Sequence, residues 1–139
     1  MIASASELER LVANEIAESG GRVTTPTLSD KKQPADLLMW LPEQDKEFFN
    51  PAAIEVKTSV MPDELAAIQS KLGSFVRKSG FSCGLVVIED RGSVENAEKV
   101  FTFPLVFVIS LEEFKTKLRK GELGSWLRQQ RNRLAHGVR

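Results

Sequence analysis

The chain has 139 residues, 42% of them hydrophobic and 27% charged, a composition typical of one globular domain, which we expect to span residues 1–139. Its single cysteine, Cys83, excludes an intramolecular disulfide framework, and with the single histidine, His136, it excludes zinc sites built from several Cys and His side chains. The longest apolar stretch, 103–109, is too short to cross a bilayer, and the first ten residues lack the apolar core of a signal peptide. We therefore expect a cytoplasmic protein with no membrane partner.

The net charge of zero hides a strong asymmetry. Residues 1–114 contain 11 Lys and Arg against 18 Asp and Glu, whereas residues 115–139 contain 8 against 1. A basic helical region over 111–139 suits a polyanion such as DNA, because each neutralised phosphate releases counterions. A solvated helix face docked on the acidic body explains the same charges equally well. The candidate nucleic-acid contacts are Lys117, Arg119, Lys120, Arg128, Arg131 and Arg133.

The first elements in chain order are a helix and a hairpin. Apolar residues recur at three- and four-residue spacing over 4–19, and two glycines follow, which predicts an amphipathic helix. A short stretch over 22–25 and a polar loop come next. The apolar run 36–41 opens with a carboxylate and has the length of a strand, and 52–57 predicts its partner strand.

The second half of the chain predicts alternating helices and strands. Leu, Ile, Phe and Val recur at helical spacing over 62–80, with a proline in the first turn and a glycine at the end. The runs 83–88 and 105–109 are continuously apolar, as in strands covered on both faces, and 89–99 between them is a charged loop or short helix. Two further helices are expected over 111–120 and 125–135. The predicted fold class is α/β, with a mixed central sheet flanked by helices in the order α-β-β-α-β-β-α-α.

The predicted hairpin gathers groups that suit a magnesium site. Strand alternation places Glu55 and Lys57 on one face, while Ile54 and Val56 point into the core. If Asp36 comes alongside, two carboxylates converge with one amine. Mg²⁺ prefers such hard oxygen ligands and typically takes one or two protein carboxylates. The lysine would orient or help deprotonate a water, or offset charge on an attacked phosphate.

These residues resemble a nuclease family. Pro34-Ala35-Asp36, eighteen intervening residues and Glu55-Val56-Lys57 are similar to the motif of the PD-(D/E)XK superfamily. The element order over 4–114 resembles that of Holliday-junction resolvases and Mrr-like restriction endonucleases. The resemblance implies a restriction endonuclease-like fold and Mg²⁺-dependent hydrolysis of DNA phosphodiester bonds, with Mn²⁺ as a substitute metal. A homodimer is expected, because cutting both strands needs two sites or two encounters. A partner subunit could in addition supply target recognition.

The resemblance also implies roles for single residues. Asp36 and Glu55 correspond to metal ligands, the Val56 carbonyl to a third ligand, and Lys57 to the catalytic lysine. Many members add a glutamate from the first helix, for which Glu15 is the first choice and Glu9 the second. Glu15 stands next to the inward stripe of that helix. Some Mrr-like members add a glutamine from the second helix, and Gln69 occupies a comparable position.

Three other interpretations stay open. Glu55 and Lys57 would need no metal if they stood on the solvated outer face of a hairpin. A non-catalytic DNA-binding or assembly module that keeps the nuclease fold would suit the short chain and its acidic body. The segment from Arg131 to His136 resembles the R-N-x-x-x-H signature of HEPN ribonucleases, which are helical bundles.

Overall fold

A computed structural model describes residues 5–25, 35–42, 51–100 and 106–135. The strands in these residues are β1 (Arg22–Thr24), β2 (Leu37–Trp40), β3 (Ala52–Lys57), β4 (Cys83–Ile88) and β5 (Val106–Ser110). The helices are α1 (Ala5–Glu18), α2 (Pro62–Ser79), α3 (Arg91–Val100), α4 (Leu111–Lys120) and α5 (Leu123–Ala135).

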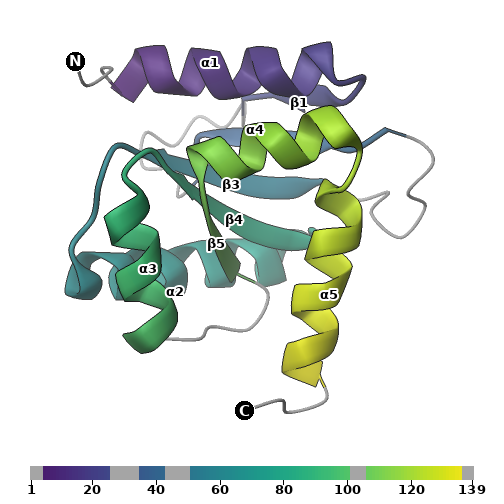
Figure 1. Cartoon of the computed structure of the whole chain (residues 1–139). Helices are drawn as coiled ribbons and strands as arrows, with labels where there is room; N and C mark the ends of the chain where they lie inside the picture. Colours follow the sequence, from purple (N-terminus) through teal and green to yellow (C-terminus); the bar gives the residue numbers. More distant parts are fainter. Residues whose placement is uncertain (1–4, 26–34, 43–50, 101–105, 136–139) are drawn as a thin grey trace.

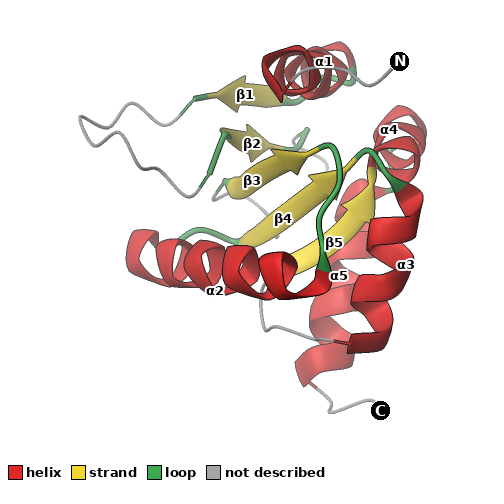
Figure 2. Cartoon of the chain, turned by 90° about the vertical axis from the view of Figure 1, so that its left-hand side faces the viewer, coloured by secondary structure: helices red, strands yellow, loops and turns green. Residues whose placement is uncertain are grey.

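The strands form one mixed sheet in the order β1-β2-β3-β4-β5 (Figure 2). The β1/β2 and β2/β3 pairs are antiparallel, and the β3/β4 and β4/β5 pairs are parallel. Leu37 pairs with Ile54 in the hairpin, and Lys57, Ile88 and Ser110 form one row across the parallel strands. The last residue of β3 therefore lies beside the last residues of β4 and β5, at the carboxyl ends of the three parallel strands.

Helices cover both faces of the sheet (Figures 1 and 2). On one face α1, α4 and α5 pack against the sheet, and their buried side chains include Val12, Phe114 and Leu127. On the other face α2 contributes Leu65 and Leu72, and α3 adds a half-buried valine. All six residues of β4 are buried because this strand has a neighbour on each side and helices on both faces. The continuous apolar pattern of 83–88 predicted this position.

Local chemistry sets the ends of the helices. Glu64 accepts a hydrogen bond from the Met61 backbone N–H, and Pro62 occupies the first turn of α2. Gly80 ends α2 with φ of 70°, a left-handed conformation that glycine adopts without steric cost. The side chain of Ser110 caps α4 by accepting a hydrogen bond from the backbone N–H of Glu113 at 3.2 Å.

The observed order adds two elements to the expected one. The α/β class and the mixed, helix-flanked sheet are confirmed. The stretch 22–25 contains a three-residue edge strand, β1. The region 89–99, expected to be a charged loop or a short helix, is mostly helical, and its helix α3 extends to Val100. Among the helices of the described residues, none combines the length and the apolar character needed to cross a membrane.

Candidate active site

Asp36 and Glu55 face each other across the hairpin. Leu37 pairs with Ile54 in the antiparallel register. Asp36, which precedes Leu37, therefore lies opposite Glu55, which follows Ile54. The Asp36 N–H donates to the Ile54 carbonyl at 2.8 Å, and the Asp36 Oδ2 accepts from the Val56 N–H at 2.8 Å. The backbone of β3 therefore fixes the Asp36 carboxylate, so the first two predicted metal ligands lie together.

The Lys57 amine joins this pair. Its Nζ lies 3.6 Å from Glu55 Oε2, and the two side chains are 36% and 15% exposed, respectively. Strand alternation places both on the face that Ala53 shares with α2, so the pair lies between a packed helix and solvent. Carbonyl groups two residues apart in a strand point to the same side. The Ile54 carbonyl accepts a hydrogen bond from Asp36, so the Val56 carbonyl also points toward the β2 side. All four residues of the predicted motif thus meet at one end of the hairpin.

The electrostatics of this cluster favour a proton or a cation between the acids. Burial, then the charge of Asp36 and hydrogen bonding with Asp36, raise the pKa of Glu55 from 4.5 to about 8. Lys57 acts in the opposite direction and offsets only part of this. Two carboxylates that resist joint ionisation gain stability from any positive charge placed between them.

The first helix supplies Glu9, not Glu15, to this cluster. Burial and the neighbouring Asp36 raise the pKa of Glu9, and Lys57 lowers it, so Glu9 lies within reach of both. Glu15, the first choice from the sequence, instead accepts two hydrogen bonds from Arg119, at 3.1 and 2.8 Å. The assignment of Glu15 to the acid cluster is therefore corrected to Glu9, about 1.7 turns earlier in α1.

Gln69 lies on the buried side of α2, the helix that covers the face of Glu55 and Lys57. Its side chain is 2% exposed, and its Oε1 has no hydrogen-bond partner within the described residues. A buried amide oxygen without a partner costs stability, so it marks a place where a donor would be favourable. Gln69 thus lies on the second long helix, and none of the hydrogen bonds found among the described residues joins it to Asp36 or Glu55.

The donor set fits a hard divalent cation with few protein ligands. Within the described ranges, no group of three or more His, Cys, Asp or Glu side chains is arranged to hold a metal ion. Asp36 and Glu55 provide two carboxylates, and Mg²⁺ commonly takes one or two, with waters and phosphate oxygens completing its shell. Burial, and after it the charge of Asp36, disfavour the ionised form of Glu55 and raise its pKa, and such a cation would offset both effects.

The predicted basic residues of α4 lie away from the acids. α4 begins directly after Ser110, which lies in the same row as Lys57. Its ten residues correspond to a helix about 15 Å long. This helix runs back toward the other end of the strands (Figure 1). The three cations of its last turn are Lys117, Arg119 and Lys120. The cluster of acids and the cations of α4 therefore occupy opposite ends of the strands.

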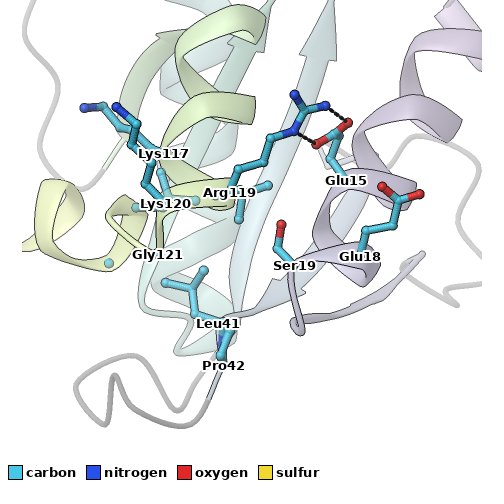
Figure 3. A pocket seen from close by; sticks show the side chains of 12 residues that line it. Glu15, Glu18, Ser19, Leu41, Pro42, Lys117, Arg119, Lys120 and Gly121 are labelled. Carbon is cyan, nitrogen blue, oxygen red and sulfur yellow. Dashed lines mark hydrogen bonds and ion pairs between the residues drawn. The ribbon is translucent and has the colours of Figure 1, made fainter.

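A cavity of about 550 Å³ marks this far end (Figure 3). Its lining includes Leu41 and Pro42, which follow β2 at the end remote from Asp36, about 16 Å along the strand. Glu15 and Glu18 of α1 form one wall, and the three cations of the last turn of α4 form another. The cavity is thus separate from the candidate active site.

The cations of α5 belong to the same end. Arg128 donates to the Ser125 hydroxyl at 3.2 Å, and the charge of Arg131 acts on Cys83, the first residue of β4. Burial raises the pKa of the Cys83 thiol to about 12, as expected for a core residue. The side chain of Arg133, together with Pro34 and His136, lies outside the described residues. A mixed sheet also differs from the helical bundle that the resemblance to HEPN ribonucleases implies.

Comparison of the chain with protein-family models, with curated proteins and with solved structures finds no match.

Proposed function

We propose that the chain is a metal-dependent nuclease that hydrolyses DNA phosphodiester bonds, with a restriction endonuclease-like core. The observation that carries the proposal is the meeting of Asp36, Glu55 and Lys57 at one end of the β2/β3 hairpin. The sequence resemblance to PD-(D/E)XK nucleases supports the same residues for the same roles. Two acids and one amine at a partly exposed strand end suit a reaction in which a charged phosphate is attacked by water.

Each residue has a distinct role in this proposal. Asp36 and Glu55 would hold Mg²⁺ or Mn²⁺, which supplies positive charge to polarise the scissile phosphate. The hydrogen bond from the Val56 N–H orients the Asp36 carboxylate for this task. Lys57, whose amine is half-exposed beside Glu55, would orient the attacking water or stabilise charge that develops on the phosphate. Glu9 would adjust the charge of the site from α1.

Cleavage of supercoiled plasmid DNA with Mg²⁺ or Mn²⁺ tests the proposal. We expect Glu55→Gln and Lys57→Ala each to lower the cleavage rate by about 100-fold or more, because each removes a group that acts on the reacting phosphate. Glu95→Gln on α3 and Lys78→Ala on α2 are matched controls, since both residues are exposed and outside the cluster. Cleavage by both site variants at the wild-type rate would refute the proposal.

A non-catalytic DNA-binding module is the second candidate, and the separation of the cations from the acids favours it. Lys117 and Lys120 would contact phosphates without bringing them to Asp36. We expect Lys117→Ala and Lys120→Ala each to reduce the salt dependence of DNA binding by about one unit of slope, measured by fluorescence anisotropy. Binding with this salt dependence, combined with no affinity for Mn²⁺, would favour the module over the nuclease.

A further inference from the structure

The backbone that follows Lys57 is fastened at two levels. The Glu89 N–H donates to the Lys57 carbonyl, and the Asp90 N–H donates to the Thr58 carbonyl, both at 2.9 Å. The residues that follow β3 are thus hydrogen-bonded to the residues that follow β4. Beyond that point the chain turns toward α2, and Val60 is buried in the apolar cluster under that helix.

A serine of α3 holds the next part of this segment. Ser93 Oγ accepts a hydrogen bond from the Val60 N–H at 3.1 Å and donates one to Asp90 Oδ2 at 2.9 Å. Asp90 Oδ2 also accepts from the Ser93 N–H at 3.2 Å, so that Asp90 caps the first turn of α3. Ser93 is only 7% exposed, so water replaces these hydrogen bonds poorly if the hydroxyl is lost.

We infer that Ser93, held by Asp90, is a positioning residue for Lys57. The inference rests on the proposed function, because it assigns the Asp90 and Ser93 pair the task of keeping the Lys57 amine beside Glu55. The segment between Lys57 and Val60 is fixed at its start by β4 and at its end by α3, so the strand end that carries the amine cannot shift independently of them. Neither Asp90 nor Ser93 touches the acids or the amine.

Chemical labelling of the Lys57 amine tests the inference without any need for nuclease activity. The full chain is treated briefly with an N-hydroxysuccinimide ester of acetic acid, and acetylation of each lysine is measured by mass spectrometry. Lys71 and Lys78 on the exposed side of α2 serve as internal references. We expect Ser93→Ala to increase acetylation of Lys57 by up to about fivefold. The loss of one net buried hydrogen bond raises the fraction of molecules in which the segment after β3 is open by about this factor.

Two variants provide matched comparisons. Ser125→Ala removes a hydroxyl from the first turn of α5, far from Lys57, and Asp90→Asn keeps an oxygen that accepts from Ser93. Both should leave acetylation of Lys57 at the wild-type level. Asp90→Ala, which removes that acceptor, replaces Ser93→Ala if the latter does not fold, as judged by circular dichroism. Equal acetylation of Lys57 in the folded disruptive variant and in Ser125→Ala would overturn the inference.

Cleavage assays separate this inference from the proposed function. In an active nuclease, Ser93→Ala should lower kcat several-fold with KM unchanged, whereas a purely structural serine would lower only the melting temperature. If the wild-type chain cuts no DNA while acetylation of Lys57 still rises in Ser93→Ala, the nuclease proposal fails and the positioning of Lys57 stands. If the chain cuts DNA and Ser93→Ala changes neither acetylation nor kcat, the inference fails and the nuclease proposal stands.

Discussion

The replacement Glu55→Gln should change how stability depends on pH. The pKa of Glu55 is raised in the folded chain from 4.5 to about 8, so the folded state retains a proton that the unfolded state releases within this window. The contribution of Glu55 to stability is therefore complete below pH 4.5 and is lost as the pH rises toward 8. Glutamine keeps the shape of the neutral carboxyl group and does not titrate, so the variant lacks this loss.

The size of the effect follows from the width of the window. Each pH unit within it removes at most about 1.4 kcal/mol from the free energy of unfolding, which gives an upper limit of about 5 kcal/mol. Solvent reaches part of the Glu55 side chain and Lys57 stabilises its ionised form, so we expect a loss of about 1–3 kcal/mol in the wild type. Across the same window the curve for Glu55→Gln should be correspondingly flatter, with a smaller contribution of the same sign left from Glu9.

Urea unfolding measures the free energy of unfolding at several pH values between about 5 and 8. The fluorescence of Trp40 and Trp126 reports the transition. Glu95→Gln, which removes an exposed carboxylate of α3, is the control and should follow the wild-type curve. Addition of Mn²⁺ near pH 8 should restore stability to the wild type more than to Glu55→Gln, because ligand binding to the folded state alone stabilises it. Parallel curves for the wild type and Glu55→Gln would refute the assigned coupling between the two acids.

Two further predictions concern the packing of the fold. Gly84→Ala should destabilise the chain by about 1–3 kcal/mol in urea unfolding, because its Cβ would lie 2.9 Å from the fully buried Leu72 side chain, closer than side chains pack. Unchanged stability would mean that α2 shifts away at little cost. Arg119→Ala should lower the melting temperature more than Lys120→Ala does, because Arg119 is the one of these two residues that pairs with the largely buried Glu15 carboxylate. Equal melting temperatures of the two variants would show that solvent replaces this pair.

The spacing of apolar residues in the sequence predicted the helices and strands that bury a continuous apolar face. It did not distinguish the short strand β1 or the helix α3 from a loop. β1 spans three residues with a single half-buried side chain, Val23, so its alternation is too short to read from the sequence. α3 packs through Val94 and begins after Asp90, whose capping of Ser93 is a recognisable helix start. That capping pattern could have favoured a helix over a loop for the region 89–99.

The candidate site could be predicted as far as it depends on neighbouring strands. The spacing between Asp36 and Glu55 fits a hairpin, and the hairpin brings them together. The choice between Glu9 and Glu15 depends instead on the direction in which α1 crosses the sheet. Both residues flank the same inward stripe of α1, so the helical period does not distinguish them, and only the tertiary arrangement places Glu9 over the acids.

The three cations of the last turn of α4 lie at the end of the strands opposite to Asp36 and Glu55, so these cations are gathered away from the hairpin acids. If the chain binds DNA as we propose, the field of a duplex should turn the cation-bearing end toward the phosphates before contact, with the hairpin acids facing outward. Mobile ions weaken this torque beyond about 8 Å at physiological ionic strength. Lower salt should therefore accelerate the first encounter with DNA without accelerating any step at Asp36 and Glu55, which reach a phosphate only after the molecule rotates or when another copy presents the strand.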